Sequence, residues 1–388
     1  MKYTFKDICT KIGSGATPTG GKEAYKGGDY ALVRSQNVLD YTFTTSGLAY
    51  INETQAKKLD GVKVEAGDVL LNITGDSVAR ACIIPDEILP ARVNQHVAII
   101  RANNQYTLNE YLLYFLQYNK QYLLSISQGG GTRSAITKKM IEDIEIDLPS
   151  IEDQLAIVNI INSISKKIEV NQQINDNLEQ QASFLFQDWL SNCNSNVSIR
   201  ELAENVLDYT QNKCEQVYLL NSSDVTEGRF SSLPLVSNTN LKGQFKKRFK
   251  KGDILYSEIR PRNRHYAYCY FDADRYIAST RLIILRAKPD MLTSSTVLYQ
   301  YLMLNSVFEE FTLKTESRSG TFPQGNYEDL SSIRVPYSAN QEEIAKSLEV
   351  IYEQLWNNLK ENERLEALRD SLLPKLMSGE LKINNLDC

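Results

Sequence analysis

A heptad pattern of apolar residues runs through residues 154–189 and predicts one long amphipathic helix. Every third or fourth residue belongs to one seam, which is apolar except for two asparagines: Ile157, Ile161, Ile164, Ile168, Asn171, Asn175, Leu178, Ala182, Leu185 and Trp189. Nothing in this stretch breaks a helix. At about 1.5 Å per residue the helix would be a rod of roughly 50 Å, which needs a partner helix to cover its apolar stripe.

The same pattern recurs 187 residues further along the chain. The second seam reproduces both asparagines and consists of Ile344, Leu348, Ile351, Leu355, Asn358, Asn362, Leu365, Arg369, Leu372 and Leu376. Two equivalent helices can pair antiparallel about a pseudo-twofold axis. Asn171 should then face Asn362, and Asn175 should face Asn358, where buried amides fix the register of the pair.

The duplication extends beyond the helices. LVRSQNV (32–38) aligns with LLNSSDV (219–225), AGDVLLN (66–72) with KGDILYS (251–257), and HVAIIR (96–101) with RLIILR (281–286). Because these segments are short β-rich runs bounded by Gly, Asp and Asn, each copy should be a β-rich domain followed by its long helix.

The pattern therefore predicts an α+β fold in which two pseudo-symmetric β-rich domains are joined by two long helices that pair as an antiparallel coiled coil. The expected boundaries are 1–147 and 196–335 for the domains, and 148–195 and 336–388 for the helical regions. One further helix is expected at 108–127, with its counterpart at 293–313. Pro374 should kink or end the second long helix.

Composition fits two ordinary domain cores, because 42% of the 388 residues are hydrophobic. The sequence contains no run of about 18 apolar residues, and MKYTFKDICTKIG lacks the apolar region of a signal peptide, so we expect a cytoplasmic protein without a membrane partner. The six cysteines are scattered singly, which favours free thiols in a reducing compartment over a disulfide or zinc framework.

Charge is distributed unevenly along the chain, although the net charge is only −5. Between Arg229 and Arg281 there are 12 Lys or Arg residues against four Asp or Glu residues, whereas residues 151–190 carry six acidic residues against two lysines. A basic domain attached to an acidic helix suggests that the domain binds a polyanion and the helix binds protein.

Candidate catalytic motifs fail on inspection. GGK (20–22) resembles part of a phosphate-binding loop, but Ala16 stands where a glycine is required and Glu23 where Ser or Thr is required. His96 and His265 are the only histidines, too few for a His/Cys zinc cluster, and the position of His96 in a strand favours a structural role. We find no nucleophile elbow, no methyltransferase motif and no convincing nuclease carboxylate pair. The enzyme that remains conceivable is a fused nuclease-methyltransferase with an unrecognised active site.

The residues of the second domain point instead to DNA binding. FKKRFKKGD (245–253) interleaves aromatic and basic residues, as expected of a surface that neutralises phosphates, and SEIRPRNRHY (257–266) places three arginines at alternate positions, where they could read guanine edges. The alternatives are a solvated loop and an exposed charged strand. The candidate DNA-binding residues of this domain are Lys246, Lys247, Arg248, Lys250, Lys251, Arg260, Arg262, Arg264, Arg281 and Arg318.

The charge of the first domain is nearly balanced, but this domain offers donors and acceptors suited to base edges at a strand end and in a glycine-rich loop, GGGTR (129–133). Loop glycines are equally consistent with simple turns. The candidate DNA-binding residues here are Arg34, Ser35, Gln36, Asn37, Arg80, Asn94, Gln95, Thr132 and Arg133. A coiled-coil adaptor that never binds DNA is the remaining alternative, and the basic segment of the second domain argues against it.

Several phrases of the sequence resemble those of specificity subunits of type I restriction-modification systems. They are ATP followed by YKGGDY (16–30), GDVLLNITG (67–75), NQHVAIIR (94–101), LPSIEDQ (148–154), NLEQQASFLFQDWL (177–190) and LRDSLLPKLMSGEL (368–381). Together these phrases are specific, and they extend over nearly the whole chain.

This resemblance implies a non-catalytic subunit with two target-recognition domains, each reading one half of a split site in double-stranded DNA. It also implies helical regions that set the spacer length and bind two modification (methyltransferase) subunits, with restriction (motor-nuclease) subunits joining for cleavage. No cofactor is expected in this chain. S-adenosylmethionine, ATP and Mg²⁺ are expected on the partner subunits.

Overall fold

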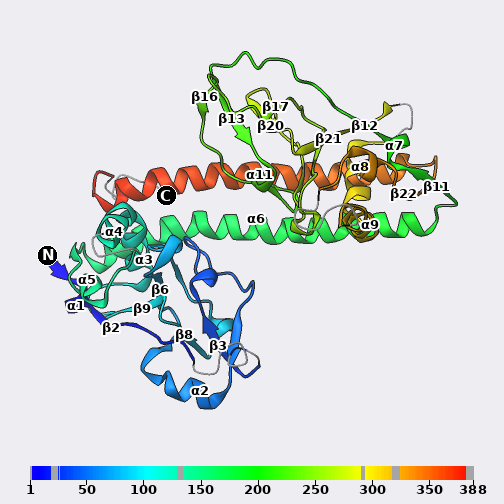
Figure 1. Ribbon diagram of the computed structural model, residues 1–388. Helices are drawn as coiled ribbons and strands as arrows, with labels where there is room; N and C mark the ends of the chain where they lie inside the picture. Colours follow the sequence, from blue (N-terminus) through cyan, green and yellow to red (C-terminus); the bar gives the residue numbers. More distant parts are fainter. Residues whose placement is uncertain are drawn as a thin grey trace. The chain divides into compact units, whose positions relative to one another are not determined.

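The computed structural model describes residues 2–18, 25, 27–128, 134–289, 293–316 and 324–381. The chain divides into two compact units: unit 1 comprises Met1–Glu169 and Glu363–Cys388, and unit 2 comprises Val170–Asn362. Figure 1 shows two long helices, α6 (Ile151–Ser191) and α11 (Glu342–Met377). Each helix contributes one part to unit 1 and the other part to unit 2. Within the described ranges, no helix combines the length and apolar content needed to cross a membrane.

Unit 1 contains two four-stranded sheets, in the orders β2-β9-β6-β7 and β4-β3-β8-β5, and the short pair β1-β10. The strands are β1 (Lys2–Thr4), β2 (Cys9–Ser14), β3 (Tyr30–Val33), β4 (Ala49–Ile51), β5 (Lys63–Val64), β6 (Val69–Asn72), β7 (Ala81–Ile83), β8 (Ala91–Val93), β9 (Val97–Ala102) and β10 (Glu145–Asp147). The helices are α1 (Phe5–Ile8), α2 (Glu53–Lys58), α3 (Asn109–Tyr118), α4 (Lys120–Ser127) and α5 (Lys138–Glu142), and the 3₁₀ turns are η2 (Ser35–Asn37), η3 (Asp60–Val62), η4 (Gly75–Ser77) and η5 (Asp86–Ile88).

Unit 2 repeats this topology, with sheets β12-β21-β18-β19 and β16-β13-β20-β17 and the pairs β11-β22 and β14-β15. The strands are β11 (Ser195–Ser198), β12 (Ala203–Asn205), β13 (Gln216–Leu220), β14 (Val225–Thr226), β15 (Arg229–Phe230), β16 (Val236–Ser237), β17 (Phe245–Lys247), β18 (Ile254–Ser257), β19 (Tyr266–Tyr268), β20 (Tyr276–Ser279), β21 (Leu282–Ala287) and β22 (Arg334–Tyr337). The helices are α7 (Ile199–Leu202), α8 (Ser295–Met303), α9 (Asn305–Glu316) and α10 (Tyr327–Ser331), and the 3₁₀ turns are η6 (Ser222–Asp224) and η7 (Pro261–Asn263).

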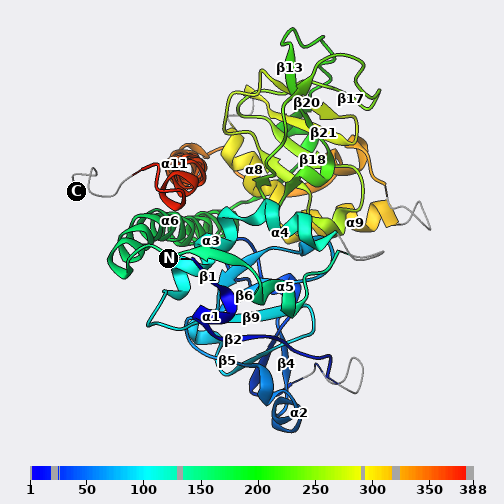
Figure 2. The same cartoon turned by 90° about the vertical axis from the view of Figure 1, so that its left-hand side faces the viewer.

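The central strand of each domain is buried on both faces. In unit 1, Val69 and Leu71 of β6 share a core with α3 and α6, whereas Leu70 between them belongs to the core that includes β3 and β8. In unit 2, Ile254 and Leu255 of β18 divide in the same way between two cores. Figure 2 shows α3 beside β6 and α8 beside β18. Alternation places successive side chains on opposite faces, so both sheet faces are packed.

The two long helices are antiparallel within unit 2, as the sequence predicted. Asn171 Nδ2 donates to Asn362 Oδ1 at 2.8 Å, and Asn358 Nδ2 donates to Asn175 Oδ1 at 2.8 Å. All four amides are at most 6% exposed. The α+β fold with two related domains and antiparallel helices is therefore confirmed.

One position of the predicted seam is wrong. Leu185 is 39% exposed, and its neighbour Phe186 is buried, where it packs against Trp189 and Tyr301. A straight α-helix drifts by about 20° per heptad relative to an ideal 3.5-residue repeat, so a seam extended over several heptads moves to the next residue.

Other local expectations need smaller corrections. The single helix expected at 108–127 is two helices, α3 and α4, separated at Asn119, and its counterpart is likewise divided into α8 and α9. Helix α11 continues through Pro374 and ends at Met377. Five cysteines are unpaired thiols in the described residues (Cys9, Cys82, Cys193, Cys214 and Cys269), whereas Cys388 lies outside them.

Removing one amide of the inter-helix pairs should destabilise unit 2. Asn171→Ala deletes the donor to Asn362 Oδ1 and leaves a buried acceptor without it, which should cost about 1–3 kcal/mol of unfolding free energy. Urea denaturation measures this loss. Gln172→Ala, at an exposed position of the same helix, is the control and should change stability little. Equal stability of the two variants would mean that the amide pair contributes nothing.

Candidate nucleic-acid interface

Three turns meet at one end of the central strands in unit 1. The turn η2 follows β3, the turn η4 follows β6, and His96 precedes β9. Buried Asn72, the last residue of β6, ties two of them together because its Nδ2 donates to Ser35 O at 2.9 Å and to Val38 O at 3.2 Å. Ile73 N donates to His96 O at 3.0 Å and brings in the third.

These turns surround a shallow groove of about 410 Å³. The lining residues are Ser35, Gln36, Thr74, Gly75, Asp76, Ser77, Arg80 and His96. Thr74 Oγ1 and His96 Nδ1 lie 2.6 Å apart, and Gln95 Nε2 lies 2.9 Å from His96 Nε2. Hydroxyl, amide, imidazole and guanidinium groups are the donors and acceptors that read base edges and phosphates.

Unit 2 builds the corresponding turns from different residues. Arg260 and Arg264 flank the turn η7, and both have left-handed backbone angles (φ +47° and +51°), as do the aligned Gly75 (φ +75°) and Ala79 (φ +67°). Glu258 N donates to Arg281 O at 2.9 Å, which repeats the contact from Ile73 to His96. The three arginines of unit 2 (Arg260, Arg262 and Arg264) therefore occupy positions equivalent to the groove-lining turn η4 of unit 1.

The side chains around η7 are already engaged with the protein to different degrees. Arg262 forms two hydrogen bonds with Glu316, at 2.7 and 3.0 Å, and remains largely exposed. Arg264 donates to Asn305 at 3.0 Å and lies over the Phe308 ring. Arg260 and Arg281 are exposed. A contact within the protein, such as those of Arg262 and Arg264, fixes the orientation of the guanidinium before it meets a planar acceptor such as a base edge.

Not all of the basic run 245–253 is available for DNA. Lys246, Lys250 and Lys251 are exposed, whereas Arg248 is half-buried and donates to Asp274 O at 3.0 Å. Lys247 is 5% exposed, and its ammonium donates to Leu282 O at 2.6 Å. Burial lowers the pKa of Lys247. We therefore remove Lys247 from the predicted contact surface, since its charge points into the domain.

Two predicted residues of unit 1 need the same correction. Asn37 is fully buried, and its Nδ2 donates to Thr44 O at 3.0 Å and to Ser46 O at 3.2 Å. Asn94 is 8% exposed, and its Oδ1 accepts from His96 N at 3.0 Å. Both amides hold turns in place from inside the domain. They support the groove and do not line it.

The other predicted residues of unit 1 are distributed around the groove. Ser35, Gln36 and Arg80 line it, Gln95 contacts His96, and Arg34 donates to Gly47 O beside the turn η2. Thr132, Arg133 and Arg318 lie outside the described residues. Ser134 O accepts a hydrogen bond from Gly75 N at 3.2 Å.

Sequence reasoning missed the segment Thr74, Gly75, Asp76 and Ser77, which lines the groove. The signal was present, because the duplication aligns 75–79 with the arginine-bearing segment 260–264. His96, interpreted from the sequence as structural, also lines the groove. Within the part of the chain that the structure describes, no group of three or more His, Cys, Asp or Glu residues is placed to hold a metal ion.

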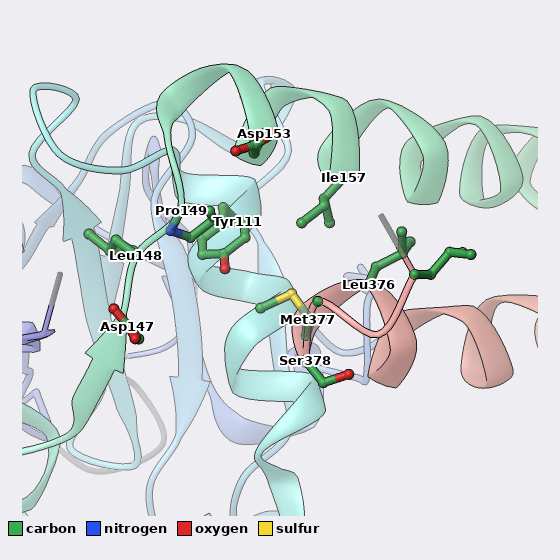
Figure 3. Close-up of a pocket in the computed structure, with 11 residues that line it drawn as sticks. Tyr111, Asp147, Leu148, Pro149, Asp153, Ile157, Leu376, Met377 and Ser378 are labelled. Carbon is green, nitrogen blue, oxygen red and sulfur yellow. The ribbon is translucent and has the colours of Figure 1, made fainter. Parts of the chain in front are cut away.

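A second cavity of unit 1, about 550 Å³ in volume, lies where α6 begins and α11 ends (Figure 3). Tyr111, Asp153, Ile157 and Met377 are among its lining residues. Asp153 accepts from Ser150 Oγ at 2.9 Å, and Ser150 Oγ accepts from Asp153 N at 3.1 Å. The Asp153 carboxylate is therefore engaged in the hydrogen bonds that begin α6. The cavity and the groove share no lining residue.

The fold is a duplicated α+β architecture in which each repeat carries polar or basic turns at one end of its central strands. A family model for the type I restriction modification DNA specificity domain matches residues 1–180 and 215–367, and the chain belongs to this family. The resemblance noted in the sequence is thereby confirmed.

Two curated relatives and one solved structure are similar to this chain. The type I restriction enzyme HindI specificity subunit of Haemophilus influenzae is 33% identical over 163 residues, which is 42% of this chain and only 35% of the relative. The MjaIX specificity subunit of Methanocaldococcus jannaschii is 22% identical over 98% of this chain and 93% of its own length. The crystal structure of a type I S subunit from M. genitalium shares the fold, with a TM-score of 0.59 at 15% identity over 97% of this chain and 95% of that one.

Proposed function

We propose that this chain is the non-catalytic subunit that reads a two-part sequence in double-stranded DNA, each repeat reading one part. The observation that carries this proposal is the recurrence of the same turns at the same strand ends in both units, with polar side chains in unit 1 and arginines in unit 2. Phosphate contacts from Lys246, Lys250 and Lys251 would add affinity without sequence preference.

The helices are proposed to dock two methyltransferase subunits, with restriction subunits joining for cleavage in the cytoplasm. Large apolar side chains on the helices support docking: Leu155 and Leu368 in unit 1 are 50% and 44% exposed, and Phe184 and Val350 in unit 2 are 71% and 69% exposed. S-adenosylmethionine, ATP and Mg²⁺ would then bind to the partner subunits, and this chain would hold no cofactor.

Methylation-aware sequencing tests the proposal directly. DNA from cells that carry this chain and its methyltransferase partner should show methylated adenines within one split motif, and deletion of this chain should abolish them. The competing enzyme hypothesis predicts that the purified chain alone transfers methyl groups from S-adenosylmethionine to DNA. That result would contradict a non-catalytic role.

Arginines and lysines of unit 2 should have different effects on DNA binding. Substituting one base-reading arginine should cost about 1–3 kcal/mol and relax one half of the motif, and Arg260→Ala/Arg262→Ala/Arg264→Ala combines the three candidates. The matched double variant Lys246→Ala/Lys250→Ala should weaken binding to all sequences and flatten the salt dependence. Titration of randomised duplexes at several salt concentrations separates the two effects. Wild-type affinity and preference in the triple variant would remove these arginines from the interface.

A further inference from the structure

Arg369 occupies a seam position of α11 that the first helix fills with Ala182. Its side chain is only 13% exposed and pairs with the exposed Asp370 at 3.0 Å, and its guanidinium carbon lies 3.8 Å from the centroid of the Tyr41 ring. Such a stacked, largely desolvated cation–π contact is stronger than an exposed one. Arg369 therefore connects the last part of α11 to a turn of the recognition domain within unit 1.

Tyr41 has a backbone conformation that disfavours a side chain. Its φ is +65°, and its N–H donates to Ala81 O at 2.9 Å. Unit 2 has the same turn, because the bridge Val38–Phe43 corresponds to the pair Val225–Phe230, and the residue aligned with Tyr41 is Gly228 (φ +83°). Glycine adopts this region without steric cost, whereas a tyrosine must be held there by its surroundings.

The segment after Tyr41 contacts the candidate DNA-reading residues. Arg34 donates to Gly47 O, and Gln36 Nε2 donates to the same oxygen at 3.2 Å. Asn37 Nδ2 donates to Thr44 O and Ser46 O. The turn 42–47 and the turn η2 are thus one hydrogen-bonded assembly that begins at Tyr41. A shift at Tyr41 would move the side chains of Arg34 and Gln36 as well.

We propose that Arg369 is a positioning residue for base recognition by the first repeat: by holding the Tyr41 ring, it fixes the turn 42–47 and the η2 side chains that lie against the groove. This inference rests on the proposed DNA-reading function. It makes the selectivity of one half-site depend on a side chain that lies outside the recognition domain, in the long helix.

The test uses the full chain in complex with its methyltransferase partner and a randomised duplex library. Arg369→Ala should reduce discrimination in one half of the motif about tenfold, as expected for the loss of a desolvated cation–π contact, and leave the other half unchanged. Arg364→Ala removes the same charge at an exposed position of α11 and should have no such effect. Tyr41→Phe keeps the ring and should retain wild-type selectivity.

A second background separates positioning from general destabilisation. In Tyr41→Gly the left-handed turn no longer needs support, as at Gly228, so the selectivity of both half-sites should persist. Adding Arg369→Ala to this background should then cost little. Non-additivity of this kind is the signature of two residues that act through one contact.

Three outcomes would overturn the inference: unchanged selectivity in Arg369→Ala, an equal loss in both half-sites, or the same loss in the Tyr41→Gly background. A different result would show that the proposed function itself is wrong. The wild-type complex would then show no sequence preference in the library, and both proposals would fall together.

Discussion

Arg101→Ala should destabilise unit 1 by about 3–5 kcal/mol, because it leaves a buried carboxylate without its counter-ion. Asp68 is fully buried, and Arg101 donates to its two oxygens at 2.7 and 2.8 Å. Asp68 Oδ2 also accepts from Glu65 N at 2.7 Å, so the carboxylate closes the turn before β6. Losing the guanidinium removes both the charge and the bidentate geometry.

The second repeat provides a matched variant for this prediction. Asp253 is fully buried and pairs with Arg286 at 2.7 and 2.9 Å, so Arg286→Ala should destabilise unit 2 to a similar extent. Denaturation by guanidinium chloride measures the loss of unfolding free energy in both variants. Lys57→Ala breaks only an exposed pair with Glu53 and should cost less than about 1 kcal/mol. An Arg101→Ala protein as stable as Lys57→Ala would refute the prediction.

Lengthening the two helices together should lengthen the DNA spacer that the complex prefers. One heptad inserted between Glu169 and Val170, with another between Glu363 and Arg364, keeps the antiparallel pairing defined by the asparagines and the phase of the seam. Seven residues add about 10 Å of helix. At about 3.4 Å per base pair, this corresponds to roughly three base pairs.

The measurement is methylation of a library in which spacer length varies. Both half-site sequences should be unchanged, because the inserted residues lie outside the two β-rich domains. Inserting the heptad into α6 alone is the control. It leaves the Asn171–Asn362 pair in place but shifts Ile157 and Ile161 of α6 by one heptad relative to Leu373 and Leu376 of α11, with which they share the core of unit 1. This variant should impair the complex without yielding a new, defined spacer length. A doubly extended protein that methylates with the original spacer would show that the helices do not set this distance.

The features that the sequence predicted correctly depend on periodicity and repetition. The heptad seam located both long helices, and the recurrence of Asn171 and Asn175 at Asn358 and Asn362 predicted their partners correctly, because antiparallel pairing of a duplicated helix brings the two copies together. The alignment of 66–72 with 251–257 likewise anticipated equivalent central strands, β6 and β18.

The errors arose where a side chain's direction depends on tertiary packing. Lys246 and Lys247 are adjacent in a basic run, yet β17 turns one outward and the other into the domain, where its ammonium donates a hydrogen bond to Leu282 O. Composition cannot distinguish these two lysines, but alternation with the aromatic residues does, because Lys247 shares its parity with Phe245 and with the buried Phe249. Asn37 was misassigned for a similar reason. The sequence does not reveal whether an asparagine side chain is buried and stabilises a turn or is exposed and available to DNA.

The division of the chain into units has a consequence for its synthesis on the ribosome. Unit 2 is one continuous segment, Val170–Asn362, whereas the core of unit 1 includes Leu373 and Leu376. A chain translated as far as Asn362 holds all residues of the later-made unit but lacks two core residues of the earlier-made one. The half that emerges second can therefore complete its packing first, and the half that emerges first must wait until the last turns of α11 have left the exit tunnel.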